Sequence, residues 1–185
     1  ERIFLLLDTS KDKSEKHIES KNINLDGNIE FNNINFSFEE NNILKNINLT
    51  IESGKKTAFV GLSGSGKSTL INLLLRFYDD YSGDIKIDNH NIKSLSLFDL
   101  RENISLITQE TLLFNESILD NIRYGNMSCG DKEIEQIATL SGVSKFADKL
   151  PEQLRTLVGE SGIKLSGGQR QRIAIARALI KNAPI

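Results

Sequence analysis

The fold of this chain is decided by the segment Gly61-Leu62-Ser63-Gly64-Ser65-Gly66-Lys67-Ser68-Thr69. Its spacing is a glycine, four residues and then Gly-Lys-Ser, which is typical of a loop that wraps around phosphate groups. Glycines let the backbone curl so that successive N–H groups point inward at an anion. A helix that begins near Lys67 would add the positive end of its dipole. The segment therefore predicts a phosphate-binding loop.

The residues on either side of the loop fit a strand before it and a helix after it. Thr57–Val60 is a short apolar run, rich in β-forming residues, that suits a buried strand. From Leu70 to Phe77 the apolar residues are too dense for a surface strand and favour a buried helix. This strand–loop–helix order is the context that the motif requires. The alternative is a glycine-rich strand-to-helix turn that binds no ligand.

The side chains of the loop have distinct predicted roles toward a nucleoside triphosphate. Lys67 is expected to reach the β- and γ-phosphates, and the Ser68 hydroxyl to ligate Mg²⁺. Thr69 adds a second hydroxyl near the phosphates. The remaining residues expected to hold phosphates are Gly61, Ser63, Gly64, Ser65 and Gly66.

Upstream of the loop, apolar and polar residues alternate with the period of a strand. Ile29 and Phe31 begin the pattern, which resumes one residue out of phase at Ile34. This slip predicts a bulge or a break in the strand. A second alternating run covers 47–51, and residues 39–42 between the two runs have turn composition. We expect a β-hairpin or meander here.

Downstream of the loop the pattern is first mixed and then helical. The runs 84–88 and 104–108 predict two further strands. Residues from about 115 to 154 carry helical spacing, and Gly167–Ile180 predicts a final helix. The apolar stripe of that helix comprises Ile173, Ala176 and Ile180.

These patterns together predict an α/β fold. We expect a P-loop core that carries an antiparallel β subdomain and a helical subdomain at about 115–170. Residues 10–24 are polar and aperiodic, as in an exposed linker. The predicted organisation is therefore a connecting segment at 1–24 and one domain at 25–185.

Composition excludes several classes of protein. The 23 basic and 25 acidic residues nearly cancel, to a net charge of −2, so we expect no nucleic-acid partner. The single cysteine, Cys129, cannot form an internal disulfide and is compatible with a reducing compartment. No apolar run approaches the roughly 20 residues of a membrane helix. Any membrane part is therefore expected outside this chain.

A second glycine-rich segment reads Leu165-Ser166-Gly167-Gly168-Gln169 and is followed by Arg170-Gln171-Arg172. It resembles the signature motif of ATP-binding cassette (ABC) proteins. Physically it is a second anion site, with two glycines and a serine at a helix N-terminus. The alternative is an ordinary helix cap in which Ser166 and Gln169 form a capping box, and both can hold, since they use the same N–H groups.

The resemblance implies how the two loops are used. In ABC proteins two such domains pair head to tail, and the signature of one closes over ATP held by the loop of the other. By that resemblance a monomer cannot complete the site. The residues that would act in trans are Ser166, Gly167, Gly168 and Gln169.

Further positions match the family pattern one by one. Gln109 resembles the glutamine that ligates Mg²⁺ and senses the γ-phosphate, and Lys67 and Gln109 are the expected catalytic residues within this chain. Phe38 stands where an aromatic residue, usually tyrosine, stacks on adenine; a strand core residue is the alternative. Base stacking would survive this replacement, and a hydroxyl contact would be lost.

Three segments resemble exporter-type members of the family. Thr156–Gly162 is similar to an exporter motif that precedes the signature. The stretch 113–125 is similar to the region that receives the coupling helices of the membrane domain. Arg2–Asp8 is similar to the end of the connection from that membrane domain.

The resemblance implies an ATP-driven exporter subunit of the multidrug or half-transporter kind, with ATP and Mg²⁺ as cofactors. Its partners would be a second ATP-binding domain, in a homo- or heterodimer, and a transmembrane domain, with this domain on the cytosolic or organelle-interior side. Two alternatives remain: a soluble ABC ATPase without a transport role, and a regulatory module that binds ATP without hydrolysing it.

The family also places an aspartate and a glutamate in an apolar strand just after a segment like Arg177–Ile185, and a histidine later still. The glutamate polarises the attacking water. We expect these groups to lie beyond this chain, so that the chain binds ATP and lacks turnover by itself, because phosphoryl transfer depends on positioned charges.

Overall fold

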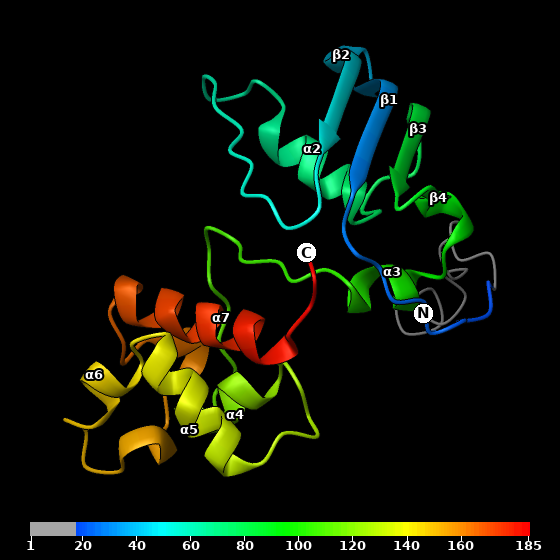
Figure 1. The fold of residues 1–185 in the computed structure, drawn as a ribbon. Helices are drawn as coiled ribbons and strands as arrows, with labels where there is room; N and C mark the ends of the chain where they lie inside the picture. Colours follow the sequence, from blue (N-terminus) through cyan, green and yellow to red (C-terminus); the bar gives the residue numbers. More distant parts are fainter. Residues whose placement is uncertain (1–17) are drawn as a thin grey trace, which may run out of the picture. The chain divides into compact units, whose positions relative to one another are not determined.

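The computed structural model describes residues 18–185, which form two compact units (Figure 1). The first unit runs to Ile104 and includes Pro184 and Ile185. The second unit comprises Ser105–Ala183. Arg2–Asp8, the part of the predicted connecting segment that resembles the connection from a membrane domain, lies outside the described residues.

The first unit is built on an antiparallel sheet with the strand order β2-β1-β3-β4. Its strands are β1 (Ile29–Phe38), β2 (Asn41–Ile51), β3 (Ser82–Ile87) and β4 (His90–Asn91). The predicted hairpin is confirmed as β1 and β2. The predicted slip is also confirmed, because the register of β1 against β2 shifts between Phe31 and Ile34, with Asn33 at a φ of 52°.

Three helical elements of the first unit lie within the described residues. They are α2 (Lys67–Leu74), the 3₁₀ turn η1 (Ile92–Ser94) and α3 (Leu97–Glu102). The core packs the apolar residues of α2 with those of the sheet and α3. The fully buried side chains at its centre include Ile34, Leu73, Ile85, Ile87, Ile92 and Leu100.

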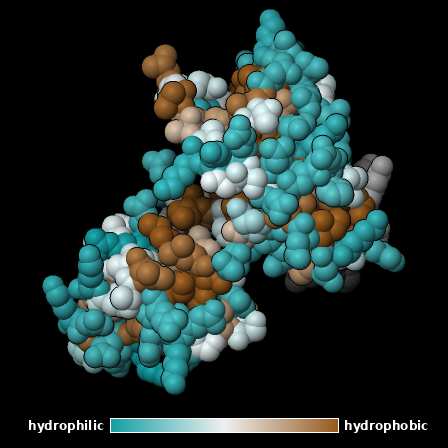
Figure 2. Space-filling view, in the orientation of Figure 1, coloured by the Kyte–Doolittle hydropathy of each residue, from teal (hydrophilic) through white to brown (hydrophobic). Residues whose placement is uncertain are grey.

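Two predicted strands are wrong. Residues 57–60 and 104–108 are irregular and pair with no other strand in the described part of the chain. Val60 and Leu62 are 90% and 85% exposed, and a small group of hydrophobic residues projects from the loop before α2 (Figure 2). An apolar run provides a surface to bury, but a strand also needs a ladder partner for its N–H and C=O groups.

The end of the predicted linker is bonded to the first unit. The Asp99 carboxylate, at the start of α3, accepts hydrogen bonds from Ser20 Oγ (2.7 Å), Lys21 N (3.0 Å), Asn22 N (3.0 Å) and Ser96 Oγ (2.7 Å). Burial by itself would raise the pKa of Asp99, but these hydrogen bonds outweigh burial and lower that pKa to about 2. The carboxylate is therefore charged when it holds residues 20–22.

Two more side chains hold the residues that follow. Asn103 accepts from Leu25 N at 3.0 Å and donates to Ile23 O at 2.8 Å. Asp88 accepts from the backbone N–H groups of residues 26–28. The segment 20–28 is thus attached to the unit by polar side chains before β1 begins.

The second unit is helical, as its spacing predicts. Its elements are α4 (Ile118–Arg123), α5 (Asp131–Leu140), α6 (Ser144–Ala147), η2 (Gln153–Arg155), η3 (Glu160–Gly162) and α7 (Gly167–Lys181). The predicted stripe of α7 is confirmed, since Ile173, Ala176 and Ile180 are all buried. They pack with α4 and α5 in a separate core.

Candidate nucleotide-binding site

The phosphate-binding loop lies at the N-terminus of α2 in the first unit. Gly66 is the N-cap residue, with a φ of 88°, and no side chain caps the helix. The loop residues from Gly61 to Ser65 are exposed. A helix N-terminus without a side-chain cap has N–H groups available for another acceptor. These amides therefore fit the phosphate oxygens of a nucleotide.

The Lys67 ammonium group lies inside this loop. Its Nζ atom donates to Gly61 O at 3.0 Å, Leu62 O at 2.7 Å and Ser65 Oγ at 3.2 Å. The loop backbone thus surrounds the Lys67 ammonium group, whose positive charge suits a phosphate ligand. Ser68 and Thr69 follow in the first turn of α2, where their hydroxyls have the chemistry that a bound Mg²⁺ requires.

Gly66 is required by its conformation and by close packing. A methyl group at this position would lie 2.7 Å from Leu44 Cδ2 and 3.2 Å from Ile43 O. The positive φ is also strained for any residue with a side chain. The β2 strand therefore supports the turn that aims the loop at its ligand.

The second predicted anion site lies at the N-terminus of α7 in the second unit. Ser166 is the N-cap residue, and its Oγ accepts from Gln169 N at 3.3 Å. In return, Gln169 Oε1 accepts from Ser166 N at 2.8 Å. The capping-box alternative is therefore confirmed. No atom would lie within 4 Å of a methyl group on Gly168, so nothing in the described chain requires a glycine there.

Gln109 lies in an irregular exposed segment of the second unit, and the strand predicted before it is absent. It lines a cavity of about 620 Å³ together with Glu160 and Ser161 of the exporter-like motif and with Ile163, Gly167 and Arg170. The unit therefore brings Gln109 and the start of the signature helix to one cavity. Phe38 and the phosphate-binding loop belong to the first unit.

Comparisons with known proteins identify the family of the chain. A family model described as ABC transporter matches residues 44–185. The chain belongs to the ABC transporter family.

Relatives of this ABC transporter chain are named as exporters and flippases. The ATP-dependent lipid A-core flippase of Syntrophus aciditrophicus is 46% identical over 185 residues, which is 100% of this chain and 31% of that protein. A putative multidrug export ATP-binding/permease protein of Staphylococcus aureus is 47% identical over 161 residues, covering 86% of this chain and 28% of that protein.

A solved structure shares the fold. The structure of a bacterial Atm1-family ABC exporter with ATP bound matches this chain with a TM-score of 0.91 and 36% sequence identity. The match covers 100% of this chain and 33% of the exporter chain. The chain thus spans about a third of the length of these relatives. Within residues 18–185, no helix is long and apolar enough to cross a membrane.

Sequence reasoning missed a buried polar centre in the second unit of this ABC transporter chain. Asn121, fully buried in α4, donates to Phe114 O and Ser117 O and accepts from Phe114 N, each at 3.0 Å. Arg177 of α7 donates to Asn121 O at 2.9 Å and to Leu112 O at 3.2 Å. Burial lowers the pKa of Arg177. The only signal in the sequence was a polar residue within an apolar helix stripe.

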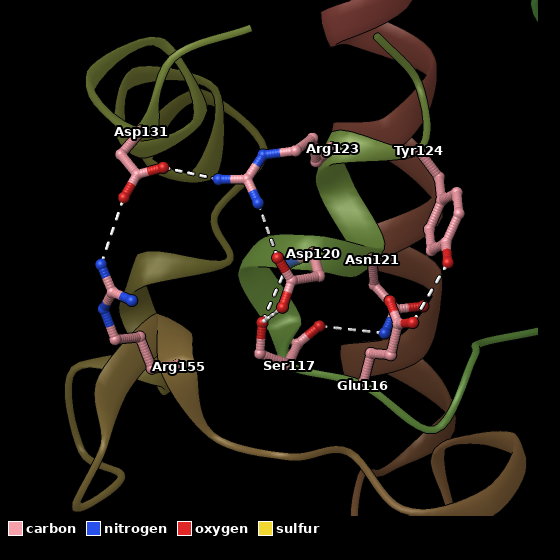
Figure 3. Close-up of polar contacts among 8 residues, drawn as sticks. All are labelled: Glu116, Ser117, Asp120, Asn121, Arg123, Tyr124, Asp131 and Arg155. Carbon is pink, nitrogen blue, oxygen red and sulfur yellow. Dashed lines mark hydrogen bonds and ion pairs between the residues drawn. The ribbon is translucent and has the colours of Figure 1, made fainter. Parts of the chain in front are cut away.

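A groove of about 460 Å³ lies beside this centre, on the segment that resembles the region receiving coupling helices. Its lining residues are Asn115, Glu116, Ser117, Asp120, Arg123, Tyr124, Met127 and Leu157. Arg123 pairs with Asp120 at 2.7 Å and with Asp131 at 2.5 Å, and Asp131 also pairs with Arg155 (Figure 3). This chain of ion pairs connects α4 to the start of α5 and to η2.

The rim of the groove joins two exporter-like segments. Val158 N donates to Glu116 O at 3.0 Å, and Ile118 N donates to Thr156 O at 3.1 Å. Tyr124 OH donates to Glu116 at 3.2 Å (Figure 3). Burial, and then the Glu116 carboxylate, raise the pKa of Tyr124. The two segments therefore form one surface within the unit.

Proposed function

We propose that this chain is the ATP-binding domain of an ABC exporter, and that it binds MgATP at the N-terminus of α2. The observation that carries this proposal is the Lys67 ammonium group inside an exposed loop, at a helix end with no side-chain cap. That arrangement matches a chain of phosphate groups in both charge and geometry. The names of the relatives and the ATP-bound neighbour support it.

Each predicted site residue has a role in this proposal. The loop from Gly61 to Thr69 would bind the phosphates, Ser68 and Gln109 would ligate Mg²⁺, and Phe38 would stack on adenine. Mg²⁺ would supply positive charge that stabilises the phosphates. The signature at Ser166–Gln169 contributes to the ATP site of a second copy or a homologous domain.

The groove beside α4 is the proposed contact with the membrane part of the exporter. Its ion pairs fix α4 against α5, and its rim exposes Tyr124, Met127 and Leu157 to a partner. An apolar rim over a rigid polar base suits a short amphipathic helix. In this proposal the domain works on the cytosolic or organelle-interior face of a membrane and drives export of a substrate that the membrane part selects.

The test is calorimetric titration of the full-length protein with MgATP. Lys67→Ala removes the charged donor to the phosphates, worth about 1.5–3 kcal/mol per hydrogen bond, so we expect roughly 100-fold weaker binding. Lys45→Ala, at an exposed position of β2, is the matched control and should bind as the wild type does. Equal affinity of the Lys67→Ala variant and the wild type would exclude the proposed site.

A further inference from the structure

Three aromatic rings gather at the end of β1 in the first unit. The Phe38 ring centroid lies 4.8 Å from that of Phe36, at an interplanar angle of 83°, and 5.0 Å from that of Tyr78, at 84°. Phe36 and Tyr78 are 5.5 Å apart and tilted by 39°. The Phe38 ring therefore contacts two rings whose planes are nearly perpendicular to its own.

In this geometry neither neighbouring ring is stacked on Phe38. Both contacts are perpendicular, so neither neighbour lies flat on a face of Phe38. Phe36 is buried, whereas the Phe38 side chain is 40% exposed. Edge-to-face contacts are favourable for aromatic pairs, and they fix the plane of a ring that would otherwise rotate.

The residues near Tyr78 on both sides make side-chain contacts that anchor this segment. Arg76 donates to Leu95 O at 3.0 Å and forms an ion pair with Asp79 at 2.9 Å. The Arg76 side chain is 5% exposed, so this pair is shielded from solvent. The residues on either side of Tyr78 are thus anchored through Arg76 and Asp79, and the Tyr78 ring contacts Phe38.

We propose that Tyr78 is a positioning residue for the nucleotide base: it holds the Phe38 ring in the orientation that stacks on a purine. The proposal rests on the proposed function, in which Phe38 is the stacking residue. One continuous stretch from Gly61 to Asp79 carries the phosphate-binding loop at its start and Tyr78 near its end. In this proposal Tyr78 links the orientation of the Phe38 ring to α2, the helix whose N-terminus binds the phosphates.

The test compares two ligands on the full-length protein, MgATP and magnesium tripolyphosphate, which has the phosphates without a base. Tyr78→Leu keeps an apolar side chain but removes the ring, so MgATP should bind about 3- to 10-fold more weakly. Tripolyphosphate should bind as tightly as it does to the wild type. Tyr78→Phe keeps the ring and should restore MgATP affinity.

A neighbouring aromatic residue serves as the matched control. Phe77 is exposed, and its ring faces the Arg101 guanidinium group at 5.3 Å. Phe77→Leu should leave both affinities unchanged. If Tyr78→Leu weakens both ligands equally, Tyr78 supports the fold and not the base, and the proposal is overturned. The same holds if Tyr78→Leu binds MgATP as the wild type does.

A double-mutant cycle separates this inference from the function on which it rests. If Tyr78 acts through Phe38, then Phe38→Leu alone and Phe38→Leu with Tyr78→Leu should have the same MgATP affinity. Additive losses would contradict the inference. If Phe38→Leu changes the affinities for MgATP and tripolyphosphate by the same factor, base stacking by Phe38 fails. If Phe38→Leu weakens only MgATP binding and Tyr78→Leu weakens the binding of neither ligand, only the role of Tyr78 is removed.

Discussion

The N-termini of α2 and α7 are both glycine-rich, but they differ in what satisfies their backbone N–H groups. At α2 the N-cap is Gly66, and no side chain caps the helix. At α7 the Ser166 and Gln169 side chains form a complete capping box. The end of α2 therefore needs an external acceptor, whereas the end of α7 is stable without one.

The space around the glycines also differs between the N-termini of α2 and α7. Gly66 is packed against Leu44 and Ile43, whereas Gly168 has open space. The glycine of α2 is thus required by the fold of this chain. The fold of the second unit does not require Gly168, so the small size of this residue matters only for a ligand or partner that binds at this surface. This agrees with a loop that binds ligand in its own domain and a signature that acts in trans.

The largest effect is expected from Gly66→Ala. The methyl group would meet Leu44 at 2.7 Å and force a strained φ, at a cost of about 2–4 kcal/mol. Both the melting temperature and MgATP affinity should fall, as measured by calorimetry. Gly54→Ala, also at a positive φ but with no atom within 4 Å, controls for backbone strain alone. Equal losses in the two variants would show that packing against β2 is unimportant.

Ser166→Arg should affect only the partner's site. A bulky cation at the start of α7 would occupy the space of an approaching nucleotide, while the loop of the first unit is untouched. We expect normal MgATP affinity and no ATP-dependent closure of the two domains. Distances between spin labels on the two ATP-binding domains of the full-length protein would measure closure. Normal closure in this variant would contradict the in-trans role.

Gly168→Ala is a milder form of the same test. No atom lies within 4 Å of the added methyl group, and alanine is the better helix former by up to about 1 kcal/mol. Thermal stability should be equal or slightly higher, and closure should weaken. Lower thermal stability would mean that the glycine has a structural role within its own unit, and would break the comparison.

The smallest effect is expected from Ser166→Ala. It removes the Oγ acceptor of Gln169 N, and loss of such a cap costs about 1 kcal/mol. Denaturant unfolding measured by circular dichroism should detect this loss. Ser128→Ala, in an exposed turn of the same unit, is the control. An unchanged free energy of unfolding would show that the capping box is not needed to hold α7.

The sequence predicted elements whose signal is local. The stripe of α7 and the bulge between Phe31 and Ile34 depend on spacing alone, and both are confirmed. Strands at 57–60 and 104–108 were wrong because strand formation depends on a partner that no local pattern contains. The motif at Gly61–Ser68 was found from glycine spacing, although the strand expected before it is absent.

Other features could not be predicted because they depend on tertiary contacts. The fully buried Asn121 bonds with Arg177, which is far away in the chain, and no local pattern identifies this pairing. The contacts of Tyr78 with Phe38 likewise join the end of one strand to a turn after a helix. Phe38 was chosen by its position relative to the loop, and its role in stacking stays a prediction.

The hydrogen bonds between Asp99 and residues 20–22 determine which part of the first unit would first bear a pulling force on the chain. Tension on the chain ahead of Ser20 would act first on the Asp99 carboxylate and so on α3, before it reached β1. Asn103, just after α3, holds residues 23 and 25, so both ends of this short helix share the load. The sheet is thereby shielded from traction, and α3 is the element that tension would displace first.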